Sequence, residues 1–107
     1  MDGADALAWQ LKAAGHTGWQ REVHLIPGRK FRTDLAHLQA RIAVEVDGGT
    51  WVAGRHNRGA GVSSDCEKAC LIAIAGYRGM RVTTEQVKNG MALKWIEQAL
   101  KRSLEAA

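Results

Sequence analysis

The stretch that most constrains this chain runs from Phe31 to Trp51, where two short apolar-rich runs flank a polar turn. This pattern predicts a β-hairpin. The second run alternates apolar and polar residues, so its apolar side chains share one face of the strand. Its acidic side chains, Glu45 and Asp47, then share the opposite face.

The register of this hairpin decides what the acidic face can do. If His37 pairs with Ile42 across the turn, then Asp34 of the first run lies directly opposite Glu45. Opposed residues of an antiparallel pair have Cβ atoms about 4.5–5.5 Å apart. Two like charges so placed destabilise the sheet unless a cation lies between them. We therefore expect Asp34 and Glu45 to bind a divalent metal ion.

Length and charge set broad limits on the rest of the chain. A chain of 107 residues is long enough for one core, so we expect a single domain over residues 1–107. The net charge of +4 suits a polyanionic partner but is shared by many ordinary domains. No apolar run approaches the roughly 18 residues that span a membrane. The acidic N-terminus lacks the positive segment of a signal peptide, and we expect a cytoplasmic protein with no membrane partner.

Periodicity predicts the remaining elements. They are a helix over 4–14, a strand over 19–26, the hairpin, a helix over 63–75, a strand over 78–83 and a helix over about 91–104. This order is that of a small α/β layer design with a mixed sheet. We expect Trp9 to pack on a neighbouring element.

The helix over 63–75 is predicted to be central. Ser64 and Glu67 fit a capping box at its start, and its later part is apolar almost all round. Its two cysteines, Cys66 and Cys70, are expected to be small buried hydrophobic residues.

A glycine-rich stretch without a clear period covers residues 47–62. Loops this long are uncommon in compact domains and are often functional. Arg55, His56 and Arg58 lie in its middle. The loop directly follows the acidic strand of the hairpin, so these three residues are candidates for the same site.

Five short motifs in this order resemble one nuclease family. They are Arg-x-Asp-Leu-Ala at 32–36, Ala-Val-Glu-Val-Asp-Gly-Gly at 43–49, the loop histidine, Asp-Cys-Glu-Lys at 65–68 and Gly-Tyr-Arg-x-x-Arg-Val-Thr at 76–83. Together with the order of elements they resemble the PD-(D/E)XK nuclease superfamily. The detail is similar to a small bacterial and phage family related to the very-short-patch-repair endonuclease, over roughly residues 19–100.

The resemblance implies a restriction-endonuclease-like domain with an α-β-β-β-α-β core, a mixed sheet and a C-terminal helix. It implies a metal-dependent DNA endonuclease that uses Mg²⁺ or Mn²⁺. Asp34 and Glu45 look like the metal-binding carboxylates, and Asp47, where the superfamily usually has Lys, would assist them. Lys68 is the candidate for a migrated catalytic lysine, and His56 is similar to a loop histidine that serves the water or the phosphate.

Two departures and one further match complete the resemblance. Thr33 stands where the superfamily has Pro before the first acid, and Asp5 matches an acid of the first helix weakly. Basic residues around the acidic pair suit contacts with DNA phosphates. These residues are Arg29, Lys30, Arg32, Arg55 and Arg58.

Plainer interpretations of the same residues remain open. The two carboxylates could be solvated on an open sheet face, Asp47 could be a turn residue, and Lys68 could only pair with Asp65 on the helix. The alternative function is a non-catalytic DNA-binding or phage–host interaction module that keeps the nuclease fold. The oligomeric state, monomer or homodimer, and the preferred substrate are left undecided by the sequence.

Overall fold

A computed structural model describes residues 1–48 and 60–106 of the chain. The elements are α1 (Gly3–Ala13), β1 (Trp19–Val23), β2 (Thr33–His37), β3 (Ile42–Asp47), α3 (Ala60–Ile74), β4 (Arg78–Thr83), α4 (Thr84–Lys88) and α5 (Met91–Ala106). Their order is the predicted one with a short helix, α4, added before the last. A capping box begins α4, in which Thr83 and Gln86 are bonded reciprocally.

The strands form one mixed sheet in the order β1-β2-β3-β4. The first three strands are antiparallel neighbours, and β4 runs parallel to β3. His37 pairs with Ile42, which confirms the predicted register of the hairpin. Continued by one step beyond the Leu35–Val44 pair, this register sets Asp34 and Glu45 opposite each other.

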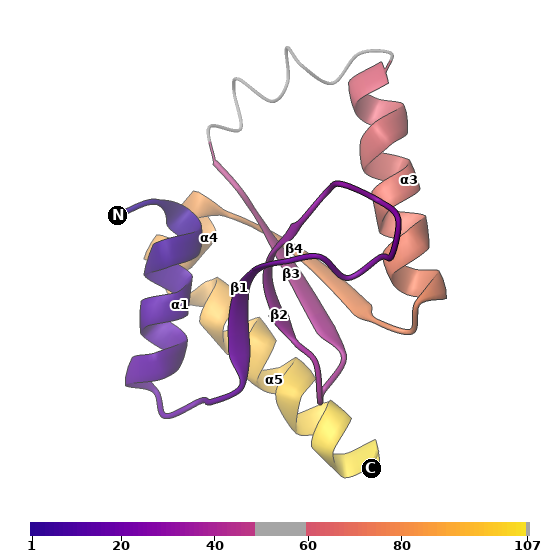
Figure 1. The fold of residues 1–107 in the computed structure, drawn as a ribbon. Helices are drawn as coiled ribbons and strands as arrows, with labels where there is room; N and C mark the ends of the chain where they lie inside the picture. Colours follow the sequence, from indigo (N-terminus) through magenta and orange to yellow (C-terminus); the bar gives the residue numbers. More distant parts are fainter. Residues whose placement is uncertain (49–59, 107) are drawn as a thin grey trace.

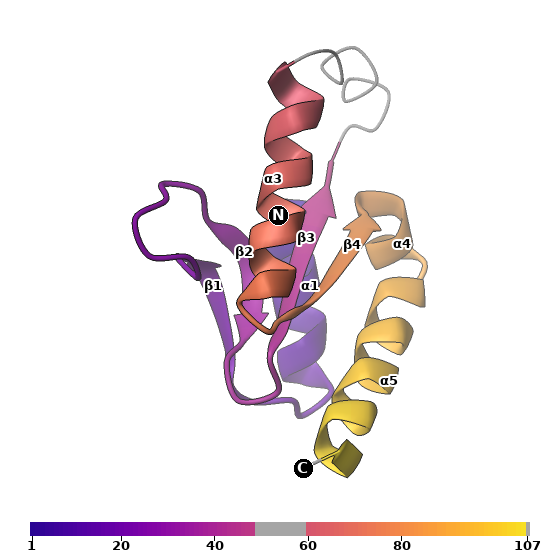
Figure 2. The same ribbon diagram turned by 90° about the vertical axis from the view of Figure 1, so that its right-hand side faces the viewer.

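The helices cover the two faces of the sheet unequally. Helices α1, α4 and α5 lie on one face, whereas α3 lies alone on the other (Figures 1 and 2). The sheet is therefore the middle of three layers. Of the two faces, only the one under α1 and α5 is packed with large apolar side chains.

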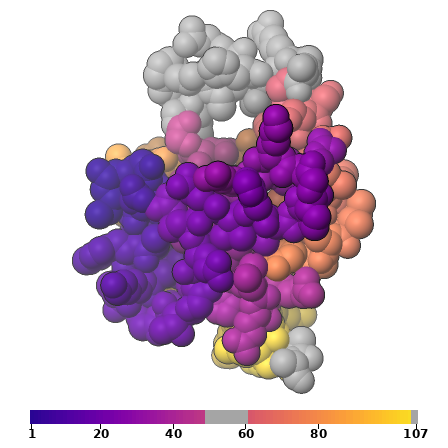
Figure 3. Space-filling model, in the orientation of Figure 1, coloured from indigo at the N-terminus to yellow at the C-terminus, as the bar shows by residue number. Residues whose placement is uncertain are grey.

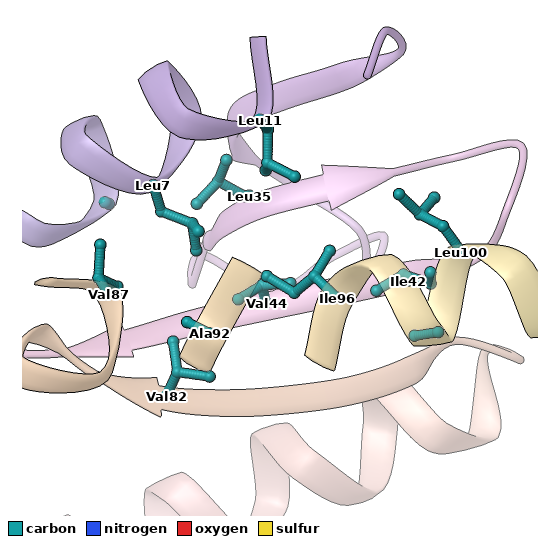
Figure 4. Close-up of a cluster of buried hydrophobic side chains, with 12 residues drawn as sticks. Leu7, Leu11, Leu35, Ile42, Val44, Val82, Val87, Ala92, Ile96 and Leu100 are labelled. Atoms are coloured by element: carbon teal, nitrogen blue, oxygen red, sulfur yellow. The ribbon is translucent and has the colours of Figure 1, made fainter. Parts of the chain in front are cut away.

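The hydrophobic core lies between the sheet and this pair of helices (Figure 4). Because side chains alternate along a strand, every second side chain of the sheet points toward this core. The fully buried members include Leu7 and Leu11 from α1, Leu35, Ile42 and Val44 from the sheet, and Ile96 from α5. Helix α5 buries one stripe of side chains, namely Ala92, Ile96, Ala99 and Leu100, and Trp95 packs against it.

Helix α3 is not the central helix that the sequence predicted. Among its side chains at 61–74, Ile72 alone is buried, and Cys66 and Cys70 are both exposed. The apolar character of the helix comes largely from alanines, which offer little area to bury. The sheet face beneath it also carries the acidic side chains. The predicted capping box is wrong as well, because the helix already begins at Ala60.

Two smaller predictions are also wrong. Trp9 is 62% exposed instead of packed on a neighbouring element. Strand β1 ends at Val23 and not at the predicted residue 26. The preceding residue, Glu22, has a φ of 51°, which lies in the left-handed region and not in that of a strand. Among the described residues, no helix has the length and apolar character needed to cross a membrane.

The core assignment can be tested by truncation on α5. Ile96 is fully buried, so Ile96→Ala should lower the free energy of unfolding by about 2–5 kcal/mol through lost burial and the cavity left behind. Urea unfolding followed by circular dichroism measures this change. Leu104→Ala on the same helix is the control, because Leu104 is 69% exposed and should cost little. Equal costs for the two variants would contradict the assignment of the buried face.

Candidate functional site

The acidic end of the β2–β3 hairpin is held open by a side chain. Backbone pairing of the two strands is recorded as far as Leu35 and Val44. Beyond it, the Val46 N–H donates to Oδ2 of Asp34 at 2.8 Å. The Asp34 carboxylate is thereby fixed against β3, next to the position of Glu45.

Helix α3 brings a lysine to this end of the sheet. Nζ of Lys68 lies 2.8 Å from Oε2 of Glu45. The same ammonium donates to the Arg32 carbonyl oxygen at 2.7 Å and lies 5.4 Å from the centre of the Phe31 ring. Lys68 therefore pairs with Glu45 on the neighbouring strand, and not with Asp65 on its own helix.

The charge balance at Glu45 is unfavourable to its ionised form. Partial burial raises the pKa of Glu45 most strongly, the Lys68 ammonium lowers it, and the charges of Asp34 and Asp47 raise it again, with a net upward shift. Oε2 of Glu45 is buried, and the Lys68 ammonium contacts it as an ion pair. The Lys68 ammonium thus offsets the two neighbouring carboxylates but not the cost of burying the Glu45 charge.

Asp47 has a different partner. Its Oδ2 accepts a hydrogen bond from Nε of Arg81 on β4 at 2.6 Å. Nη2 of Arg81 lies 3.5 Å from Oδ2 of Asp65 on α3. The two carboxylates raise the pKa of the Arg81 guanidinium, the Asp47 hydrogen bond most strongly.

Arg81 was missed as a site residue when the sequence was considered alone. It lies inside the Gly76–Thr83 motif, and the parallel register pairs it with Glu45. Residues paired in a parallel ladder project to the same face. The predicted strand therefore contained the signal, but only its pairing with β3 connects Arg81 to the acidic residues.

A groove of about 340 Å³ lies between α3 and strands β3 and β4. Its polar lining gathers at the site, with Glu45, Asp47, Asp65, Lys68 and Arg81. The remaining lining is formed by small or apolar side chains from both walls, namely Ala43, Gly79, Met80, Ala69, Ile72 and Ala73. The site is therefore open to a ligand from outside.

The segment before β2 lies beside α3 (Figure 3) and carries three basic residues, Arg29, Lys30 and Arg32. Arg29 pairs with Glu67 of α3 and lies 5.9 Å from the Phe31 ring centre. Nε of Arg32 donates to the His24 ring at 3.0 Å, and Lys30 is exposed.

Three predicted residues lie outside the described part of the chain. They are Arg55, His56 and Arg58. Asp5 pairs with Arg21 of β1, and this partner lowers the pKa of the Asp5 carboxyl.

The donor set at the hairpin suits a hard cation. Among the described residues, no hydrogen bond is made by Oδ1 of Asp34 or by Oε1 of Glu45. No group of three or more His, Cys, Asp or Glu side chains suited to a metal occurs within residues 1–48 and 60–106. Two carboxylates are nevertheless a fitting set for Mg²⁺, which keeps several waters and is commonly held by one or two carboxylates beside a phosphate.

Comparison with known proteins adds no relative. No protein-family model, curated protein or solved structure matches the chain. The chemistry of the site thus has to be argued from its own geometry.

The raised pKa of Glu45 predicts a pH dependence of stability. The folded protein holds the Glu45 proton to a higher pH than the unfolded chain, whose carboxyl titrates near 4.5. The free energy of unfolding should therefore fall, through Glu45, as the pH rises above about 4.5 and through the folded-state pKa. Glu45→Gln should remove this part of the slope in urea unfolding between pH 4 and about 7.

The control for this experiment is Glu85→Gln on α4. Glu85 is exposed and lies in the first turn of α4. A Glu45→Gln protein whose stability has the same pH slope as the wild type would show that Glu45 is not the group responsible.

Proposed function

We propose that this protein is a metal-dependent DNA endonuclease with a restriction-endonuclease-like fold of the PD-(D/E)XK type. The observation that supports this most is the meeting of Asp34, Glu45 and Lys68 at one end of the sheet. They come from β2, β3 and α3, so their meeting depends on the tertiary fold. Two carboxylates and an ammonium beside an open groove are suited to phosphodiester hydrolysis.

In this proposal Asp34 and Glu45 hold Mg²⁺ or Mn²⁺ through the oxygens left free by Val46 and Lys68. When bound, the metal lowers the pKa of a water ligand and polarises a phosphoryl oxygen. Asp47, the third predicted ligand, is left out of this set because Arg81 occupies its Oδ2.

Lys68 has the geometry of a charge-stabilising donor. An ammonium has donors only, and two of those of Lys68 face Glu45 and the Arg32 carbonyl. In this proposal, its position beside Glu45 would supply positive charge next to the reacting phosphate. Hydrolysis forms a bond between a water oxygen and phosphorus and breaks the bond to a sugar oxygen. Lys68 would stabilise the negative charge that develops on the phosphate oxygens.

The basic residues before β2 would bind the DNA backbone. Arg29, Lys30 and Arg32 are exposed and belong to the segment that supplies the Arg32 carbonyl to Lys68. Contacts with phosphates orient DNA without reading its sequence. Binding that relies on such contacts weakens as the salt concentration rises.

Cleavage of a supercoiled plasmid tests the reaction. The wild type should nick or cut it only with Mg²⁺ or Mn²⁺ present. Asp34→Asn and Glu45→Gln should each slow cleavage at least about 100-fold, because each removes a group that binds the metal. Glu85→Gln, at an exposed carboxylate on α4, should cleave at the wild-type rate. Undiminished cleavage by both site variants would refute the assignment.

Binding of Mn²⁺ provides a second test that needs no turnover. A ligand that binds only the folded state raises the thermal midpoint. Mn²⁺ should raise the midpoint of the wild type and fail to do so in Asp34→Asn. Salt-sensitive DNA binding, with neither hydrolysis nor this stabilisation, would instead support a non-catalytic DNA-binding module.

A further inference from the structure

Arg81 occupies an unusual place beside the proposed site. The parallel register pairs it with Glu45, so it projects from β4 on the face that α3 covers. Its guanidinium is nevertheless bound elsewhere, to Asp47 through Nε and to Asp65 through Nη2. Arg81 thus leaves Glu45 to Lys68 and connects the end of β3 with α3.

The ion-paired side chains of α3 are concentrated in a single turn. Asp65 pairs with Arg81, Glu67 with Arg29, and Lys68 with Glu45. Further along, Ile72 is the one buried side chain among residues 61–74. The apolar packing that normally fixes the rotation of a helix is therefore sparse, and polar contacts have to set the direction of Lys68.

A guanidinium suits this task better than an ammonium. Its planar group offers donors along two edges, so it can bind two carboxylates from different elements at once. The Arg81 side chain is 54% exposed, and exposed ion pairs add little to global stability. The contacts of Arg81 with Asp47 and Asp65 instead fix the position of α3 relative to β3. Asp65 lies one helical turn before Lys68, and fixing one fixes the direction of the other.

We propose that Asp47, Arg81 and Asp65 form a positioning network that holds the α3 turn carrying Lys68 against Glu45. The ion pairs themselves support the existence of this network. Its effect on DNA cleavage rests on the proposed nuclease function. Arg81 is then a positioning residue that acts through Lys68. Asp47 serves to anchor Arg81 and is not a metal ligand.

Kinetics of plasmid or oligonucleotide cleavage test the consequence. Asp65→Asn removes the α3 end of the network and leaves the Arg81–Asp47 pair in place, and Arg81→Gln removes both contacts. Each should lower kcat about tenfold or more with KM changed less than twofold, since a displacement of about 1 Å can cost as much as 100-fold. The expected order is a larger loss for Arg81→Gln.

The matched control is Arg78→Gln. Arg78 lies on the same strand but donates to the Ala99 carbonyl oxygen of α5. It should keep the wild-type kcat and KM. A wild-type kcat in Asp65→Asn, or a loss in Arg81→Gln that lies in KM alone, would overturn the proposal and favour direct contact of Arg81 with substrate.

The position of Lys68 can be followed by NMR without any cleavage. The Lys68 side chain lies over the Phe31 ring, so its Hε protons should be shifted upfield and show an NOE to that ring. Both signals should weaken in Asp65→Asn and persist in Arg78→Gln. Unchanged Lys68 signals in Asp65→Asn would overturn the positioning role even if the wild type cleaves DNA. If the wild type does not cleave DNA but its Lys68 signals still weaken in Asp65→Asn, the nuclease function is refuted and the positioning network stands.

The assignment of Asp47 has its own test. Asp47→Asn should keep the rise of the thermal midpoint with Mn²⁺ and weaken the Lys68–Phe31 NOE. Asp34→Asn should lose the rise. Loss of the Mn²⁺ effect in Asp47→Asn would overturn the assignment and return Asp47 to the metal ligands.

Discussion

The ion pair between Lys68 and Glu45 is the contact on which the proposed chemistry depends. It joins α3 to the middle of the sheet across a groove whose other lining residues are small, apolar or charged. Partial burial and the neighbouring carboxylates work against the Glu45 charge, and Lys68 only partly offsets them. In the proposed function, a bound cation would offset the part of the burial cost of the Glu45 charge that Lys68 leaves.

The hydrophobic core and the candidate site lie on opposite faces of the sheet. The face under α1 and α5 holds the fully buried side chains, among them Leu35, Ile42 and Val44. The other face carries Glu45 and receives α3, whose side chains are largely exposed. A helix attached in this way can place a lysine beside the sheet without being part of the main core. Its position then relies on polar contacts from β3, β4 and the segment before β2.

The interpretation of Asp47 changes once its partner in the folded chain, Arg81, is known. As the second acid of a Glu-x-Asp pair, it resembles an additional metal ligand. In the folded chain, Arg81 of the adjacent strand binds it at 2.6 Å and also reaches Asp65. In the proposed nuclease, the charge that a lysine usually supplies on this strand would come from two cations, Arg81 on β4 and Lys68 on α3.

The sequence by itself determined the hairpin register and which side chains of the β3 strand and of α5 face the core. Alternation of apolar residues placed Ile42, Val44 and Glu45 on their correct faces, because side chains of a strand alternate whatever surrounds it. The stripe of α5 was equally readable, since a helix buries residues at a fixed spacing. Both signals are periodic and need no knowledge of distant elements.

The tertiary structure decided which of these elements meet. Whether α3 is central or exposed depends on what lies opposite it, and an alanine-rich helix has the same pattern in both cases. The pairing of Arg81 with Asp47 and Asp65 depends on the parallel placement of β4 beside β3. The contact of Lys68 with Glu45 depends on how α3 packs against the sheet. Such contacts join residues far apart in the chain, so the local spacing of apolar residues cannot predict them.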